Sequence, residues 1–205
     1  MMHWPSCATG GGCASGSTDP PCNQNGTQYD EKACRLSSYR ALLKVWRDGG
    51  TRSVGVSNFN ITHLTELEDA GLPLPSLNQV SFSGYHSTVE MPLLRFMQAK
   101  NIIFNSWSPL GRPDTSKGSP PGALGLLADP AVVGIATAHN TSVGKTLLAW
   151  GWQQGVLHNA RSQNAVHMVD NLRYTELQLS PTEMTILDSL KQVPCSPPHC
   201  TTVQP

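Results

Sequence analysis

Short apolar segments alternate with longer segments of helical periodicity, and this alternation limits the possible folds more than any other feature of the sequence. Segments 53–56, 77–82, 102–107 and 156–157 have the length and composition of buried strands. In the segments between them apolar residues recur every three or four positions, as on one face of a helix, over 36–46, 61–70, 92–100, 129–139, 141–154, 164–172 and 181–190. Strands that alternate with helices predict an α/β fold with a parallel sheet.

Local signals mark where several of these helices begin. Asp129-Pro130 is a capping residue followed by proline at the first helical position, and Ser180-Pro181-Thr182-Glu183 is a capping box. Asn58 or Asn60 can cap the helix that follows them, and Pro92 suits the first turn of the next one. We therefore expect these helices to start at or next to the marked residues.

The composition supports one folded core and argues against several classes of protein. The 205 residues include 14 Lys+Arg and 14 Asp+Glu, so the formal net charge is zero and gives no electrostatic reason to expect nucleic acid as a partner. Hydrophobic residues make up 39% of the chain, which is enough for a sizeable core. No apolar run approaches the roughly 20 residues of a membrane-spanning helix, and the N-terminus lacks the charged and apolar regions of a secretory signal.

The cysteines gather near the two ends of the sequence, at Cys7, Cys13, Cys22, Cys34, Cys195 and Cys200. Their spacings do not match those of common zinc sites, so no metal site is expected. Two disulfides could order the Gly/Ser/Pro/Asn-rich segment 6–34, and reduced thiols on a loop are an equal alternative. N-glycosylation patterns at Asn25, Asn60 and Asn140, together with the cysteines, keep the secretory pathway open as a compartment.

Five motifs occur in an order and spacing that resemble one enzyme family. They are His3-Trp4-Pro5, Arg52-Ser53-Val54-Gly55-Val56-Ser57-Asn58-Phe59-Asn60, Asn78-Gln79, Ser106-Trp107-Ser108-Pro109-Leu110-Gly111, and the stretch from Arg161-Ser162 to Asn171. Together they resemble the aldo-keto reductases, with Trp107 where that family has Tyr. The resemblance covers almost the whole chain except segment 6–34 and the residues after 191.

The resemblance implies a (β/α)8 barrel that binds NADP(H) and reduces small aldehydes or ketones in the cytoplasm. On that map the chain is the C-terminal part of the family, a partial barrel with strands four to eight, because a whole barrel takes about 250 residues. The expected domains are a truncated barrel over 1–191, with 6–34 as a Cys/Gly-rich loop insertion, and a Cys/Pro-rich tail over 192–205. Such a chain would be a fragment, a truncated isoform or an incomplete gene model, and its open sheet edges would favour self-association.

The catalytic part of the resemblance depends on His3 alone. In the family a nicotinamide gives hydride to the carbonyl carbon, a Tyr assisted by Lys and Asp protonates the oxygen, and a His orients the carbonyl. Among these residues the His has a counterpart here, His3, which lies close to the N-terminus, where chains often fray. We therefore expect this chain to be inactive by itself.

The cofactor-binding residues of the family have more counterparts. The resemblance implies that the nicotinamide carboxamide is bound by Ser57, Asn58 and Gln79. It implies that Trp107 stacks on the nicotinamide ring and that Ser108 and Leu110 contact the pyrophosphate. The residues implied at the adenosine end are Arg161, Ser162, His167, Asp170 and Asn171. His167 stands where the family often has an Arg for the 2′-phosphate, so NAD(H) is an alternative cofactor.

Two other functions remain as alternatives. One is a non-catalytic chain that binds a dinucleotide or another protein, and the other is a disulfide-bonded extracellular interaction module. The glycine-rich segments 10–16 and 111–117 lack the spacing of phosphate-binding loops, and we interpret both as ordinary loops.

Overall fold

The computed structural model describes residues 1–3, 5, 23–24, 28–29, 31–85, 87–111 and 125–190. Trp4, most of segments 6–34 and 111–117, and the whole 192–205 tail therefore lie outside the described residues. Cys34 is the one described cysteine, and it is disulfide-bonded. Its partner cysteine lies outside the described part of the chain.

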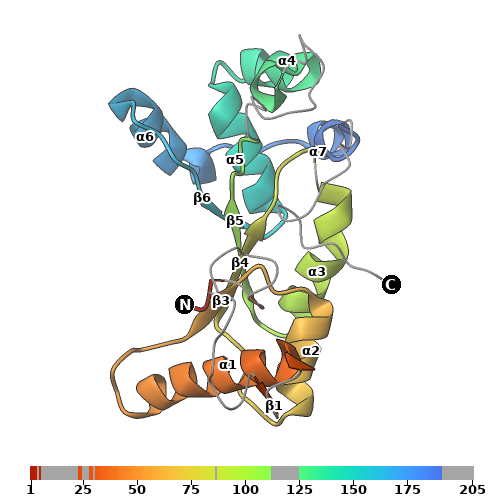
Figure 1. Ribbon diagram of the computed structural model, residues 1–205. Helices are drawn as coiled ribbons and strands as arrows, with labels where there is room; N and C mark the ends of the chain where they lie inside the picture. The colour runs from red at the N-terminus through yellow and green to blue at the C-terminus, as the bar shows by residue number, and fades with distance from the viewer. Residues whose placement is uncertain are drawn as a thin grey trace. The chain divides into compact units, whose positions relative to one another are not determined.

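Helices alternate along the chain with the strands of a four-stranded sheet whose order is β3-β4-β5-β6 (Figure 1). β3 (Gly55–Ser57) pairs in parallel with β4 (Leu77–Ser81), and β5 (Ile103–Trp107) pairs in parallel with β6 (Leu157–Asn159). A separate antiparallel pair consists of β1 (Asn23–Gln24) and β2 (Gln28–Tyr29). The predicted α/β fold with a parallel sheet is confirmed.

A fifth parallel strand was expected at the N-terminus, and the described residues contain a single bridge in its place. Met2 pairs in parallel with Val56 of β3. The amide of Met2 donates to the carbonyl of Gly55 at 3.0 Å, and the amide of Ser57 donates to the carbonyl of Met2 at 2.7 Å. These bonds attach the N-terminal residues to the outer side of β3.

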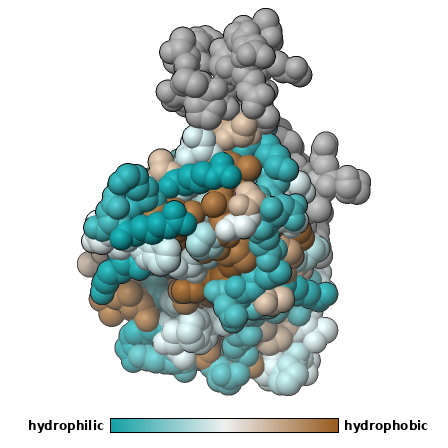
Figure 2. All heavy atoms as spheres, turned by 90° about the horizontal axis from the view of Figure 1, so that it is seen from below, coloured by the Kyte–Doolittle hydropathy of each residue, from teal (hydrophilic) through white to brown (hydrophobic). Residues whose placement is uncertain are grey.

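The described residues form two compact units, and the first contains those of Met1–Val80 and Leu93–Phe104. In it α1 (Glu31–Arg47) packs against α2 (Ile61–Asp69). Its core consists of fully buried side chains, among them Tyr39, Leu43, Val56, Phe59, Leu64, Leu67, Val80, Leu93 and Met97. Seen from below, the surface mixes hydrophilic and apolar side chains (Figure 2).

The second unit contains the described residues of Ser81–Pro92 and 105–190. Its helices are α4 (Pro130–Ala138), α5 (Val143–Gln153), α6 (Ala165–Leu172) and α7 (Pro181–Asp188). Two short 3₁₀ turns lie at Leu126–Ala128 and Tyr174–Glu176. In the core the ring of Phe82 stacks on Trp150, with 5.3 Å between the ring centroids.

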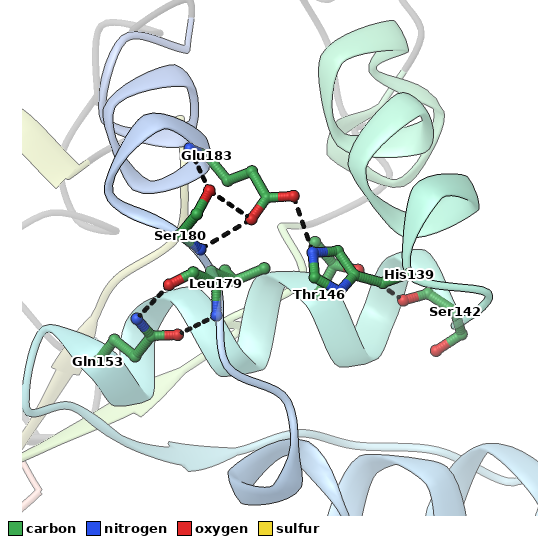
Figure 3. A network of polar contacts seen from close by, with 7 residues as sticks. All are labelled: His139, Ser142, Thr146, Gln153, Leu179, Ser180 and Glu183. Carbon is green, nitrogen blue, oxygen red and sulfur yellow. Dashed lines mark hydrogen bonds and ion pairs between the residues drawn. The ribbon is translucent and has the colours of Figure 1, made fainter.

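A polar network joins three helices of the second unit (Figure 3). The side-chain amide of Gln153 in α5 donates to the carbonyl of Leu179 at 3.1 Å and accepts from the amide of Leu179 at 2.7 Å. Nε2 of His139, at the end of α4, lies 2.7 Å from Oε1 of Glu183 in α7. The chain entering α7 is therefore held by both α5 and α4.

The predicted starts of α4 and α7 are confirmed. Asp129 caps α4 by accepting from the amide of Ala131 at 3.0 Å, and Ser180 and Glu183 form the expected capping box. Of the two candidate caps for α2, Asn60 is the residue that caps the helix.

The predicted start of α3 is wrong. The helix spans Ser87–Ala99, so Pro92 lies inside it and not in its first turn. A proline there removes one intrahelical hydrogen bond near the beginning of the helix, a loss that the packing of Leu93, Leu94 and Met97 in the buried interior offsets. None of the described helices is of a length and apolarity that could cross a membrane.

Candidate functional site

The end of β3 and the middle of β4 bring together four of the predicted site residues in the first unit. Ser57 and Gln79 are register partners in the parallel pair, and the hydroxyl of Ser57 donates to the carbonyl of Gln79 at 2.7 Å. The amide of Asn58 donates to the same carbonyl at 2.8 Å. Nδ2 of Asn58 donates to Oγ of Ser57 at 3.1 Å and to the carbonyl of His3 at 3.0 Å. We call these four residues the β3–β4 cluster.

Asn58 has a conformation that explains why an amide side chain stands there. Its φ is +61°, in the left-handed region that Asn adopts more readily than most residues. The residue is 5% exposed, and both hydrogens of its side-chain amide are used in the bonds to Ser57 and His3. The backbone of His3 is therefore held and not frayed, contrary to the expectation for a residue so near the N-terminus.

Asn78 supports the cluster from within β4, a role that the sequence motif alone did not assign. Its side chain donates to the carbonyl of Phe59 at 2.8 Å and accepts from the amide of Phe59 at 3.3 Å. Asn78 is completely buried. Because a buried amide must find hydrogen-bond partners, the place of Asn78 on the same side of β4 as the buried Val80 is the signal that could have indicated this role.

The predicted ring-stacking and pyrophosphate residues follow β5 in the second unit. Trp107 is the last residue of the strand and is half-buried. Ser108 has a φ of +54°, and its carbonyl accepts from the amide of Gly111 at 3.0 Å, so that Leu110 lies within a closed turn. A turn with a left-handed residue directs backbone amides to one side, which is a feature of anion-binding loops.

Ser162 and Arg161 precede α6 in the same unit. The hydroxyl of Ser162 accepts from the amide of Asn164 at 3.1 Å, and Asn164 caps α6 by accepting from the amide of Val166 at 2.9 Å. Arg161 is exposed. The serine therefore shapes the entry to α6, and the arginine leaves its cation in contact with solvent.

One face of α6 lines a cavity of about 560 Å³. The residues on this face follow helical spacing, and with their neighbours the lining consists of Ser142, Ala165, Val166, His167, Val169, Asp170 and Arg173. The hydroxyl of Ser142, which caps α5, donates to the carboxylate of Asp170. Two predicted residues, His167 and Asp170, thus share a cavity with an apolar surface. Sequence reasoning missed Ser142 and Arg173.

Asn171 lies on a neighbouring part of α6. A Cβ atom placed on Gly144 of α5 would lie 3.6 Å from Oδ1 of Asn171 and 3.8 Å from Cδ1 of Leu110. The side chains of Asn171 and Leu110 therefore both approach the first turn of α5, where glycine leaves room for them. Within the described residues no group of three or more His, Cys, Asp or Glu side chains could hold a metal ion.

A family model described as the aldo/keto reductase family matches residues 1–192. The chain belongs to the aldo-keto reductase family. The match begins at the first residue and runs through segment 6–34, which our motif comparison had left out. It therefore corrects the prediction that this aldo-keto reductase chain is confined to the C-terminal part of the family.

Curated relatives of this aldo-keto reductase chain are longer than the chain itself. Aldo-keto reductase family 1 member A1-A of Danio rerio is 30% identical over 94% of this chain and 57% of its own length. Morphine 6-dehydrogenase of Pseudomonas putida is 32% identical over 76% of this chain and 52% of its own length. The chain thus spans about half the length of the curated relatives it matches.

Solved aldo-keto reductase structures have the same fold over a similar span. A mutant of Gox0644 in complex with NADPH superposes with a TM-score of 0.67 at 25% identity, covering 77% of this chain and 53% of Gox0644. Aldo-keto reductase AKR2E5 of the silkworm, Bombyx mori, gives a TM-score of 0.72 at 21% identity, covering 93% of this chain and 52% of AKR2E5. The second likeness supports the fold alone.

Proposed function

We propose that this chain is the NADP(H)-binding part of an oxidoreductase that reduces small aldehydes and ketones to alcohols. The observation that carries the proposal is the β3–β4 cluster, in which the side chains of Ser57 and Asn58, at and just after the end of β3, bond to the main-chain carbonyls of Gln79 in β4 and of His3. Membership of the aldo-keto reductase family supports it, and so does the NADPH complex of the similar protein Gox0644.

The β3–β4 cluster suits a neutral carboxamide. The side chains of Ser57, Asn58 and Gln79 are uncharged, and the main-chain carbonyl of Gln79 fixes the positions of Ser57 and Asn58, so an amide bound there would have no charge from these residues beside it. Bound NADP(H) would supply the hydride for carbonyl reduction. His3, whose backbone is held by Asn58, would orient and polarise the carbonyl oxygen.

The second unit, taken by itself, also contains residues that suit a dinucleotide. Trp107 offers an aromatic face for the nicotinamide ring, and the turn of Ser108 and Leu110 offers backbone amides for the pyrophosphate. Around α6 the adenosine end would be held by Arg161, Ser162, His167, Asp170 and Asn171. We propose NADP(H) as the preferred cofactor, with NAD(H) as the alternative that a binding measurement distinguishes.

Tyr39, Tyr85 and Tyr174 are poor proton donors, which bears on whether this chain is active by itself. Burial raises the pKa of Tyr39, whose hydroxyl donates to the carbonyl of Pro73 at 2.9 Å. Burial and a hydrogen bond to Asp129 raise the pKa of Tyr85 to about 12, and burial raises the pKa of Tyr174. A general acid works best with a pKa near the working pH. This favours a chain that binds the dinucleotide without turning over a carbonyl substrate.

Calorimetric titration of the full 205-residue chain with NADPH and NADH tests the proposal. We expect NADPH to bind and the Gln79→Met variant to bind it about tenfold more weakly, since one hydrogen-bonding side chain is lost. The matched control is Gln98→Met, which changes an exposed glutamine on α3 and should leave binding unchanged. Carbonyl-dependent oxidation of NADPH should be absent. Failure of both dinucleotides to bind would overturn the proposal.

A further inference from the structure

The N-terminal segment is attached to the first unit at three successive points. Met2 shares two backbone hydrogen bonds with β3, through Gly55 and Ser57. The carbonyl of His3 accepts from Nδ2 of Asn58 at 3.0 Å. The carbonyl of Pro5 accepts from Nη1 of Arg35 at 2.8 Å. The backbone is therefore held before His3, at His3 and after it.

Arg35 supplies the charged anchor in this arrangement. Its side chain comes from α1, is 4% exposed, and donates from Nε and Nη2 to Oε2 of Glu66 at 2.9 and 2.7 Å. A buried guanidinium is tolerated when a carboxylate and further acceptors replace its water. Because the guanidinium is planar and rigid, the two bonds to Glu66 set the direction in which Nη1 points. That direction is toward the carbonyl of Pro5.

His63 reports on the charge of Arg35. Burial, and after it the positive charge of Arg35, lower the pKa of His63 to about 4. The ring of His63 accepts from the amide of Asn60 at 3.2 Å in the capping box of α2. The pKa of His63, followed by NMR titration, therefore responds in part to the charge of Arg35.

We propose that Arg35 is a positioning residue for His3: oriented by Glu66, it holds the carbonyl of Pro5 and so keeps the backbone of His3 at the end of β3. The role of His3 toward a carbonyl substrate rests on the proposed function, whereas the anchoring does not. Without Arg35, Pro5 loses its anchor, and the segment remains attached by Met2 and His3 alone among the described contacts.

Amide hydrogen exchange in the full chain, followed by NMR, compares two adjacent residues. The amide of Ser57 bonds to Met2 in the N-terminal segment, and the amide of Asn58 bonds to Gln79 in β4. In the Arg35→Met variant we expect protection of the Ser57 amide to fall about tenfold or more, because the segment opens more often. Protection of the Asn58 amide should stay the same, and the pKa of His63 should rise toward its ordinary value.

Two further variants separate anchoring from charge and from general stability. Arg35→Lys keeps the positive charge but not the rigid, planar guanidinium, so protection of the Ser57 amide should fall less than in Arg35→Met. If Arg35→Met does not fold, the comparison is made with Arg35→Lys. Lys100→Met breaks an ion pair with Glu68 in the same unit, where the side chains are 38% and 33% exposed, and should change neither amide. An equal loss at Ser57 and Asn58, or a loss at neither, would overturn the proposal.

Nicotinamide mononucleotide extends the test to function. In the unmodified chain we expect this ligand to shift the imidazole resonance of His3. The resonance is assigned by its absence from the spectrum of a His3→Gln variant. In the Arg35→Met variant we expect the ligand to cause no such shift. An equal shift in both proteins would overturn the link between Arg35 and His3. If no nicotinamide ligand binds even the unmodified chain, the proposed function fails, and the comparison of Ser57 with Asn58 still decides the anchoring.

Discussion

His158 of β6 and Gly151 of α5 occupy adjoining space in the second unit. Nε2 of His158 lies 2.9 Å from the carbonyl of Leu148, and a Cβ atom on Gly151 would lie 2.4 Å from Cε1 of His158. The ring therefore packs directly on the backbone of α5. We predict that Gly151→Ala lowers the free energy of unfolding by about 1–3 kcal/mol, measured by urea denaturation, because the ring must move.

Gly134 in α4 provides the matched control. A Cβ atom there would meet nothing within 4 Å. Gly134→Ala should stabilise the protein by up to about 1 kcal/mol, because alanine is the better helix former. Combining Gly151→Ala with His158→Ala should remove part of the penalty. Equal effects of Gly134→Ala and Gly151→Ala would contradict the steric explanation.

The same histidine predicts a loss of stability in acid. Burial lowers the pKa of His158 from 6.5 to about 4, against a smaller opposing effect of its bond to Leu148. The unfolded chain therefore takes up this proton at a higher pH than the folded chain does. The contribution is complete above pH 6.5 and is lost as the pH falls toward 4, to a maximum of about 3 kcal/mol. Denaturation across this range should show a shallower loss for His158→Gln than for the unmodified chain.

The start of α7 depends on a small set of hydrogen bonds. Oε2 of Glu183 accepts from the amide and the hydroxyl of Ser180 at 2.7 and 2.8 Å, and these bonds lower the pKa of Glu183. We predict that Ser180→Ala lowers the free energy of unfolding by about 1 kcal/mol and raises the pKa of Glu183, followed by NMR titration. Thr182→Ala removes an exposed hydroxyl from the same helix and should do neither.

Signals contained within a few residues predicted the boundaries of the helices well. The cap at Asp129 and the capping box at Ser180 each act on amides at most three positions away, so the sequence around them determines the outcome. Pro92 misled the prediction of α3 because the packing of the buried residues after it, which no local signal records, offsets the hydrogen bond that the proline removes. The isolated bridge at Met2 could not be predicted from the local sequence, since its pairing depends on β3.

The residues of the candidate site also fall into two groups: those that a local motif predicts and those that only the fold brings together. Ser57, Asn58 and Gln79 were found through a motif, and the structure brings them together at hydrogen-bonding distance. The pair of Arg35 and Glu66 could not be predicted, because its members are 31 residues apart and meet only when α1 packs on α2. Arg173 was missed for a related reason: it enters the cavity through the helical spacing of α6, which no motif records.

Over the described part of the chain, the order of the sheet leaves β6 as a terminal strand. In a closed barrel every strand has two neighbours, whereas β6 pairs with β5 alone in this sheet. A terminal parallel strand presents backbone groups to which another strand can add. We propose that copies of the chain associate through this edge.

We predict that the unmodified chain self-associates with rising concentration and that Asn159→Lys shifts it toward the monomer, measured by sedimentation velocity. Asn159 is the last residue of β6 and is exposed, so a lysine there would place a charge on the edge without disturbing the buried interior. Thr182→Lys makes the same change of charge at an exposed position of α7 and is the matched control. If both variants lowered association equally, net charge and not the edge of β6 would be responsible. If neither did, the copies would meet through another surface.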